Sequence, residues 1–207
     1  MKLIVFGATG TVGKHVVEQA LRRGHEVTAF TRDAARITAR HERLHVAQGD
    51  VADVDAVASA VAGHDAVIVT LGGGRRGDVR APGTLTIIKA MQRTGVRRLI
   101  CQSTLGVGDS RGNLNFLWKR IMFGLLLRAA YADHVRQEEH VTRSGLDWTI
   151  VRPSAFTDGP RTGEYRRGFG QDDRSGSLKI SRADVADFLV AQLTDTGYVH
   201  RTPAISY

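Results

Sequence analysis

The sequence contains very little cysteine and no long uninterrupted hydrophobic run. Cys101 is the single cysteine among 207 residues, which excludes an internal disulfide and fits a reducing compartment. The apolar run at residues 1–6 is too short for a secretion signal. A later apolar stretch at residues 116–127 is interrupted by two basic residues and a glycine, so it does not predict a membrane span. We therefore expect a cytoplasmic protein with no membrane partner.

Lysine is also scarce, and the basic charge is not concentrated in any one segment. The formal net charge is +8, carried mainly by arginines that occur as scattered pairs at residues 22–23, 75–76, 97–98 and 166–167. Basic charge without a recognition motif supports only non-specific attraction to nucleic acid. An anionic small ligand explains a local positive field equally well. We expect no specific nucleic-acid partner.

Short apolar runs alternate with longer segments of helical periodicity along the whole chain. The predicted strands are Lys2–Phe6, Glu26–Thr31, Leu44–Gln48, 66–70, Arg98–Gln102 and 149–152, and the predicted helices are 14–23, Val54–Val61, 84–94 and 131–144. This alternation predicts an α/β fold of the Rossmann type, with a doubly wound, mostly parallel sheet and helices on both faces. Ser181 and Asp184 resemble a capping box that begins a last helix. The length favours a single domain spanning residues 1–207.

A glycine-rich turn follows the first predicted strand. Gly7 permits a tight turn, Gly10 lets the backbone approach a pyrophosphate, and Gly13 lets the next helix pack closely on the sheet. The start of that helix offers free N–H groups and a partial positive charge to phosphates. Thr9 and Thr11 add hydroxyl donors. The sequence predicts dinucleotide binding at residues 7–13; a turn without a ligand is the alternative interpretation.

The residues after the second strand indicate which dinucleotide binds. An NAD-specific site places an acidic residue about 20 positions beyond the loop, where an arginine accommodates a 2′-phosphate instead. Arg32 stands at this point, and Arg36 can join it from the next turn. The pattern favours NADPH over NADH, although Asp33 would bind the ribose if the strand ended slightly later.

Two further strand ends contribute candidate cofactor contacts, because ligands of such sheets lie outside the carboxyl ends of the strands. Asp50 and Val51 close the third strand, where a carboxylate can accept from the adenine amine while an aliphatic chain covers the ring. Leu71 and Gly72 close the fourth, where small residues make room beside the ribose. Ordinary turn chemistry is the alternative at both places.

Taken with these motifs, the sequence resembles the atypical short-chain dehydrogenase/reductase group, in particular its biliverdin and flavin reductases. The matching segments are residues 6–13, 27–33, 49–51, 65–72, 133–136, 144–146, 158 with 160, and 162–165. Residues 151–153 are similar to the wider group, which includes isomerases and the non-catalytic NmrA-like redox sensors. The resemblance covers almost the whole chain.

The resemblance implies a set of site residues. The implied cofactor contacts are Gly7, Thr9, Gly10, Thr11, Val12, Arg32, Arg36, Asp50, Val51, Leu71, Gly72 and His134. Ser103 matches a serine beside the nicotinamide and is the candidate catalytic residue, with Thr104 as a neighbouring substrate contact. Pro153, Ser154, Ala155 and Phe156 are the remaining substrate candidates. Ala155 replaces a histidine of the relatives, which argues against tetrapyrrole reduction more than against hydride transfer.

The usual general acid of short-chain reductases is absent. That acid is a tyrosine assisted by a lysine four residues later, and none of the four tyrosines here has such a lysine. A flavin, a quinone or a similar planar, tetrapyrrole-like acceptor needs less help, because its developing anion is delocalised. The sequence favours an NADPH-dependent reductase of such acceptors. The alternative is a non-catalytic, NmrA-like NADPH sensor that acts through a protein partner.

The remaining polar and apolar segments do not point to one function or one kind of site. Loops near residues 105–127 and 153–177 are long enough to face a substrate, and the arginines at 111, 161, 166 and 167 are candidates for attracting a flavin phosphate. Residues 116–127 fit a pocket wall, a lid, a subunit contact or plain core. Glu138 and Glu139 are typical of a solvated helix face. His41 and His45 lack a third ligand, so we expect no metal site. A monomer or small homo-oligomer is expected.

Overall fold

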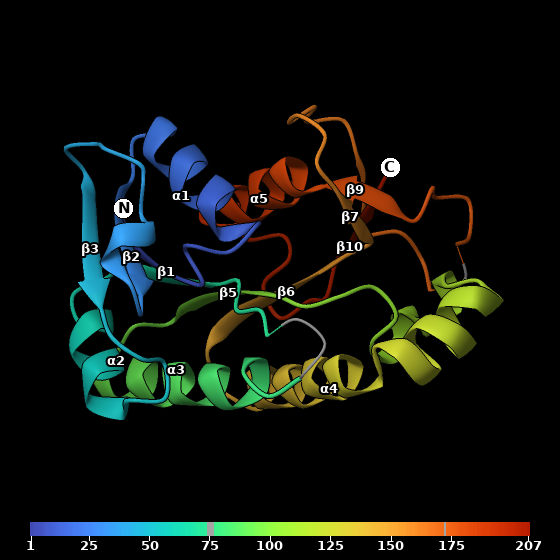
Figure 1. Cartoon of the computed structure of the whole chain (residues 1–207), viewed down its shortest axis with the longest axis horizontal. Coiled ribbons are helices and arrows are strands. Elements are labelled where there is room, and N and C mark those ends of the chain that lie inside the picture. Colours follow the sequence, from blue (N-terminus) through green and yellow to red (C-terminus); the bar gives the residue numbers. More distant parts are fainter. Residues whose placement is uncertain (74–76, 172) are drawn as a thin grey trace.

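The computed structural model describes residues 1–73, 77–171 and 173–207, and its centre is an eight-stranded sheet (Figure 1). Its strands are β1 (Lys2–Phe6), β2 (Glu26–Thr31), β3 (Leu44–Gln48), β4 (Ala66–Val69), β5 (Arg98–Gln102), β6 (Asp147–Pro153), β8 (Arg166–Arg167) and β10 (Ala204–Ser206). They lie in the order β3-β2-β1-β4-β5-β6-β10-β8. All neighbours are parallel except β8, which runs antiparallel to β10. The predicted Rossmann-type, mostly parallel sheet is confirmed.

Helices cover both faces of this sheet. Figure 1 shows α1 (Gly13–Arg22) and α5 (Arg182–Ala191) on one face, and α2 (Val54–Val61), α3 (Arg80–Thr94) and α4 (Arg128–Thr142) on the other. Successive strand residues point to opposite faces, so β1 contributes Leu3 and Val5 to one apolar cluster and Ile4 and Phe6 to the other. The unbroken hydrophobic runs seen in the sequence follow from this double burial.

Two helices begin for different reasons. In α5, Ser181 accepts a hydrogen bond from the backbone N–H of Asp184 at 3.0 Å, which confirms the cap expected from the sequence. In α3, the cap comes from another helix: the two carboxylate oxygens of Asp133 on α4 accept the N–H groups of Arg80 and Ala81, each at 3.0 Å. Because this partner is 53 residues away, the helix begins at Arg80, four residues before the expected start.

The segment at residues 116–127 forms a nine-residue π-helix, η3 (Trp118–Leu126), which lies at one end of the molecule next to α4 (Figure 1). Phe123 packs between Trp118 and Tyr131, with ring centroids 5.7 and 5.1 Å away. Phe116 and Leu125 are each 74% exposed, so plain core does not describe this segment. Within the part of the chain that the structure describes, no helix is both long and apolar enough to cross a membrane.

Glu138 does not lie on a solvated helix face as the sequence suggested. Its side chain is buried, and its two oxygens accept hydrogen bonds from the guanidinium of Arg152 at 3.0 and 2.7 Å. Arg152 lies on β6 and also pairs with Asp109, in the short helix η2 (Gly108–Asn113). A buried charge is tolerated only when it is paired, so these contacts join α4, β6 and η2.

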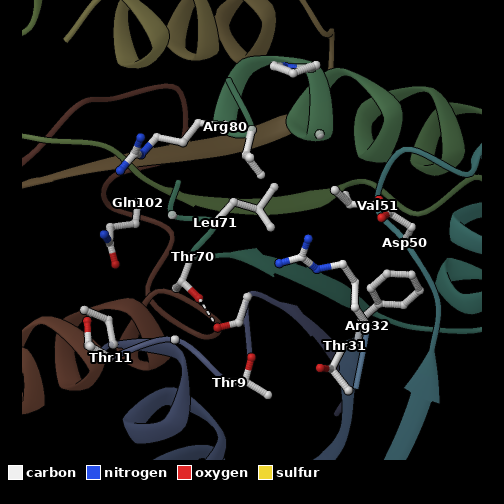
Figure 2. Close-up of a pocket in the computed structure, with 18 of the residues that line it drawn as sticks. Thr9, Thr11, Thr31, Arg32, Asp50, Val51, Thr70, Leu71, Arg80 and Gln102 are labelled. Atoms are coloured by element: carbon white, nitrogen blue, oxygen red, sulfur yellow. Dashed lines mark hydrogen bonds between the residues drawn. The ribbon is translucent and has the colours of Figure 1, made fainter. Parts of the chain in front are cut away.

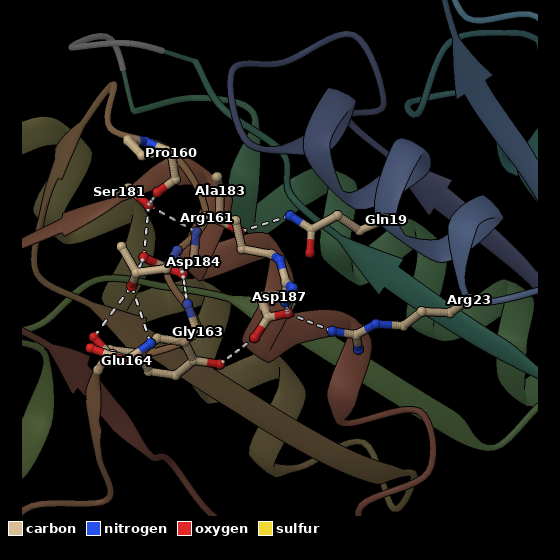
Figure 3. A network of polar contacts seen from close by, with 12 residues as sticks. Gln19, Arg23, Pro160, Arg161, Gly163, Glu164, Ser181, Ala183, Asp184 and Asp187 are labelled. Carbon is tan, nitrogen blue, oxygen red and sulfur yellow. Dashed lines mark hydrogen bonds and ion pairs between the residues drawn. The ribbon is translucent and has the colours of Figure 1, made fainter.

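A second polar network holds the loop that follows β6 against α5 (Figure 3). Asp184 is fully buried and accepts five hydrogen bonds, from Thr162 N and Oγ1, Gly163 N, Ser181 Oγ and Tyr207 Oη, at 2.6–3.0 Å. Burial alone would raise the pKa of this carboxyl, but the bonds from Tyr207, Gly163 and Thr162 outweigh it, and the pKa is lowered. The carboxylate therefore organises the loop.

Replacing Asp184 tests this role. We expect Asp184→Asn to lower the free energy of unfolding by about 3 kcal/mol, because an amide cannot accept all the bonds that the buried carboxylate accepts. Urea denaturation measures this change. In the control, Asp55→Asn, the original side chain is 88% exposed, and we expect a change within about 0.5 kcal/mol. Equal effects of the two substitutions would contradict the assignment.

Candidate functional site

A cleft of about 1280 Å³ opens at the carboxyl ends of the central strands. It is larger than the roughly 300–1,000 Å³ of most small-molecule pockets, so it suits an extended ligand such as a dinucleotide. Fifteen of the predicted site residues line it: Gly7, Thr9, Gly10, Thr11, Val12, Arg32, Arg36, Asp50, Val51, Leu71, Gly72, Ser103, Thr104, His134 and Phe156. The structure thus brings together residues from the first two-thirds of the chain with Phe156 from its last third.

Four predicted residues do not line this cleft. Gly13 lies beneath the glycine-rich turn, in contact with it rather than with the open space. Pro153 and Ala155 are engaged in strand pairing, with Ile205 of β10 and with Lys179 in the small sheet of β7 (Ala155–Thr157) and β9 (Lys179–Ser181). Ser154 donates from Oγ to Ser206 Oγ at 3.1 Å. The chain turns from one sheet to the other here, and only Phe156 reaches the cleft.

The glycine-rich turn is shaped by very close backbone packing. Gly7 has φ +83°, a conformation that side chains disfavour, and a Cβ added at Gly13 would lie 2.0 Å from the Gly7 carbonyl oxygen. Thr70 closes the arrangement by donating from Oγ1 to the Phe6 carbonyl at 3.1 Å. Helix α1 then starts with no side-chain cap and no acidic residue in its first turn. Lys14 and His15 donate their N–H groups to the Gly10 and Val12 carbonyls at 3.1 and 2.9 Å, whereas those of Thr11, Val12 and Gly13 make no backbone hydrogen bond among the described residues. These last three N–H groups are available to an anion.

At one end of the cleft, Arg32 projects into the space with its guanidinium towards Leu71, and Asp50 and Val51 line the same end (Figure 2). Asp33 also lines the cleft, but its carboxylate accepts the N–H of Ala35 at 3.0 Å and so caps a local turn. Asp50 likewise accepts the N–H of Ala52 at 2.9 Å through one oxygen. Arg32 and Arg36 therefore provide the positive charge at this end.

At the opposite end, the cleft is lined by Gln102, Ser103, Thr104, His134 and Arg80, with Arg80 and Gln102 both labelled in Figure 2. Sequence reasoning missed Arg80 because it expected the helix to begin four residues later. It also passed over Gln102, the last residue of β5, although the rule that ligands lie outside the carboxyl ends of the strands applies to it. Among the described residues, no cluster of three or more His, Cys, Asp or Glu side chains is placed to hold a metal ion.

His134 is a neutral group in this part of the cleft. Its side chain is buried, and Nδ1 lies 3.3 Å from Oε1 of Gln137. Burial, followed by the nearby charge of Arg80, lowers the pKa of His134 to about 3. At neutral pH the ring is therefore uncharged and does not serve as a cationic acid.

This pKa makes folding sensitive to acid. Between pH 6.5 and 5 the unfolded chain binds a proton at His134 that the folded chain does not, so stability is present above pH 6.5 and is lost as the pH falls. A single such group contributes a slope of up to about 1.4 kcal/mol per pH unit. We expect His134→Gln to reduce the slope measured by urea denaturation across this range. The exposed-site control, His41→Gln, should keep the wild-type slope; unchanged slopes in both variants would refute the assignment.

Comparison with known proteins shows what this chain is similar to. A family model described as NAD(P)H-binding matches residues 7–196. The chain is 31% identical to an uncharacterised chloroplast protein of Arabidopsis thaliana, over 93% of this chain and 71% of that one. It is 29% identical to the (4-alkanoyl-5-oxo-2,5-dihydrofuran-3-yl)methyl phosphate reductase of Streptomyces griseus, over 99% and 67% respectively.

A solved structure extends the comparison to the fold. ChuY, an anaerobillin reductase of Escherichia coli O157:H7, matches 100% of this chain and 97% of its own chain, with a TM-score of 0.83 and 27% identity. The chain spans only 32% of the length of some longer dehydrogenases that it matches. The similarity therefore covers this chain from end to end, whereas those longer relatives contain additional sequence.

Proposed function

The chain belongs to the NAD(P)H-binding family, among its atypical short-chain dehydrogenases/reductases, and on this premise we propose that it is an NADPH-dependent reductase of planar acceptors. The acceptor classes are flavins, quinones and tetrapyrrole-like molecules. The observation that carries the proposal is the continuous cleft that extends from Arg32 and the glycine-rich turn to Ser103 at the end of β5. The relatives from Streptomyces griseus and Escherichia coli are named reductases, which supports this class of reaction.

The residues along the cleft suit a dinucleotide in one orientation. The N–H groups at the start of α1 would hold the pyrophosphate, and Arg32 with Arg36 would pair with a 2′-phosphate. Val51 and Leu71 both lie close to Gly83, where an added Cβ would come within 2.8 Å of Leu71 and 3.1 Å of Val51, and the two side chains would provide an apolar surface for the adenine. When bound in this way, the nicotinamide would supply a hydride at the Ser103 end.

The chain's tyrosines are not available as a general acid in this cleft. Tyr131 donates to the Gly106 carbonyl at 3.0 Å, Tyr165 to Asp187 at 2.9 Å, and Tyr207 to Asp184 at 2.6 Å. Burial and the charge of Asp187 also raise the pKa of Tyr165. None of the four tyrosines lines the cleft. Such a site suits an acceptor that takes its proton from water, with Ser103 orienting the reacting groups.

The unavailability of the tyrosines also supports a second candidate, a non-catalytic NADPH sensor that acts through a protein partner. Among the described residues, His134 is neutral and none of the tyrosines lines the cleft, so the usual proton donors are missing and the cleft needs to do no more than bind its ligand. The reductase remains the first proposal because the relatives from Streptomyces griseus and Escherichia coli are named reductases. A cytoplasmic location and a monomeric or small homo-oligomeric state, without a specific nucleic-acid partner, belong to the same proposal.

Turnover distinguishes the two candidates. We expect purified protein to oxidise NADPH in the presence of at least one of FMN, riboflavin, menadione and biliverdin, followed at the absorbance band of the reduced nicotinamide. Planar stacking on the nicotinamide brings the reacting atoms together, which accelerates transfer without a protein acid. A Ser103→Ala variant should bind NADPH and turn over more slowly. Tight NADPH binding with no oxidation by any acceptor would replace the reductase with the sensor.

The cofactor preference has its own test. We expect Arg32→Ala to raise the Kd of NADPH by about 10- to 100-fold, because a charge-assisted contact with the 2′-phosphate is lost. The Kd of NADH should change little. Arg40→Ala, an exposed substitution outside the cleft, serves as the control and should leave both constants unchanged. Tighter binding of NADH than of NADPH to the wild-type protein, at matched ionic strength, would contradict the preference.

A further inference from the structure

Helix η3 and the residues just before it expose apolar side chains at one end of the molecule. Five of them form what we call the apolar face: Phe116 (74% exposed), Leu117 (52%), Ile121 (42%), Leu125 (74%) and Leu126 (48%). In this π-helix, the N–H of Leu127 donates to the Met122 carbonyl, five residues earlier, at 2.7 Å. Such wide turns bring residues four or five positions apart to the same side, and Ile121 stands at that spacing from the other four. The five side chains therefore share one side of the helix.

The other side of η3 is fixed to the protein. Phe123 packs between Trp118 and Tyr131, and the Tyr131 hydroxyl donates to the Gly106 carbonyl at 3.0 Å. These contacts hold the helix in place and leave the apolar face directed at solvent. A group of neighbouring apolar side chains that stays exposed in a folded protein marks an interaction site, because covering it removes apolar area from water.

The chain around the apolar face carries positive charge and no negative charge. Residues 110–132 contain four basic residues and no acidic one, and Arg111, Arg120 and Arg128 among them are exposed. The two flanking acids are engaged elsewhere: Asp109 pairs with Arg152, and Asp133 is buried and caps α3. An occupant that complements this face is therefore both apolar and negatively charged.

The side chains of this segment offer few hydrogen bonds to an occupant. Among residues 116–127, only Trp118, Lys119 and Arg120 carry a polar side-chain group. Protein interfaces combine an apolar centre with about ten hydrogen bonds and seat their anchoring side chains in pockets. The cavity that Phe123 lines beside η3 has a volume of about 40 Å³, which holds little more than water. A second copy of this chain would bring like charges together at the same face.

We propose that the apolar face binds the surface of an anionic lipid membrane, with η3 lying along the bilayer. A helix of this kind buries its apolar side chains at the boundary between headgroups and acyl chains, while neighbouring arginines meet the lipid phosphates. Binding along the surface needs no membrane-spanning length. The proposal therefore departs from the expectation of no membrane partner, which considered only spanning segments. It does not depend on the reaction in the cleft, because no residue of the apolar face lines the cleft.

Sedimentation with lipid vesicles tests the proposal. Purified protein is mixed with vesicles of phosphatidylcholine alone or of phosphatidylcholine with phosphatidylglycerol, and the bound fraction gives a partition coefficient. We expect partition into the anionic vesicles to be at least about tenfold stronger, because each arginine close to an anionic surface contributes about fivefold. Added salt should reduce this preference by screening the charges.

Two matched variants test the apolar contribution. Leu126→Gln should lower partition into the anionic vesicles about tenfold, because the contact of a leucine with the acyl chains is lost without a change in charge. The control is Val54→Gln: Val54 is 47% exposed and lies on α2, at the opposite end of the molecule (Figure 1), so this variant should match the wild type.

A third variant tests the contribution of charge. Arg120→Gln combined with Arg128→Gln should remove most of the preference for phosphatidylglycerol, because two of the arginines beside the apolar face are then neutral. Far-ultraviolet circular dichroism checks that each variant is folded.

Each outcome supports or overturns the proposal. The absence of sedimentation with either vesicle overturns it, and so does equal partition of the wild type and Leu126→Gln. Equal partition of the wild type into the two lipid compositions rules out an anionic surface as the specific occupant. If the wild type fails to bind vesicles and self-associates, and Leu126→Gln prevents that association, the face binds a second copy and the proposal is wrong. If Leu126→Gln does not fold, the double arginine variant compared with Val54→Gln decides the question.

Discussion

The structure depends on the close approach of helix α1 to the end of strand β1. Gly13 packs against the Gly7 carbonyl with no space for a side chain, and Thr70 of the neighbouring strand end holds the Phe6 carbonyl beside them. This contact directs the start of α1 at the cleft and leaves the N–H groups of Thr11, Val12 and Gly13 without a backbone partner among the described residues. Helix α5 packs beside α1 on the same face of the sheet (Figure 1). A bulkier residue at position 13 would displace both the phosphate-binding turn and that layer.

The two ends of the cleft are built in different ways. The end near Arg32 is formed by short contiguous segments after β1, β2 and β3, in which backbone conformation places each group. The end near Ser103 is assembled from side chains on β5, α3, α4 and β7, which come together only when the sheet has formed. Backbone N–H groups suit the phosphates of a dinucleotide. Separate side chains suit a ligand whose polar groups must each meet a hydrogen-bond partner.

This difference explains how much the sequence could predict. The strands and the glycine-rich turn were found because each is encoded locally, by unbroken apolar runs and by spacing. The start of α3 was placed too late because its cap, Asp133, lies on another helix. Glu138 was taken for a solvated residue because its partner, Arg152, is brought to it only by tertiary packing. Arg80 was missed together with the start of α3, because the residue that caps this helix is distant in the sequence.

The ion pairs of Arg152 carry a mechanical consequence. The Arg152 side chain is 6% exposed, and its guanidinium forms ion pairs with Glu138 of α4 and Asp109 of η2. If either element moved along β6, the buried guanidinium would lose an ion-pair partner, which costs free energy. Helix α4 and the sheet therefore behave as one rigid piece. Because α4 also contributes His134 to the cleft, the wall that faces a ligand beside Ser103 is fixed in place before any ligand binds.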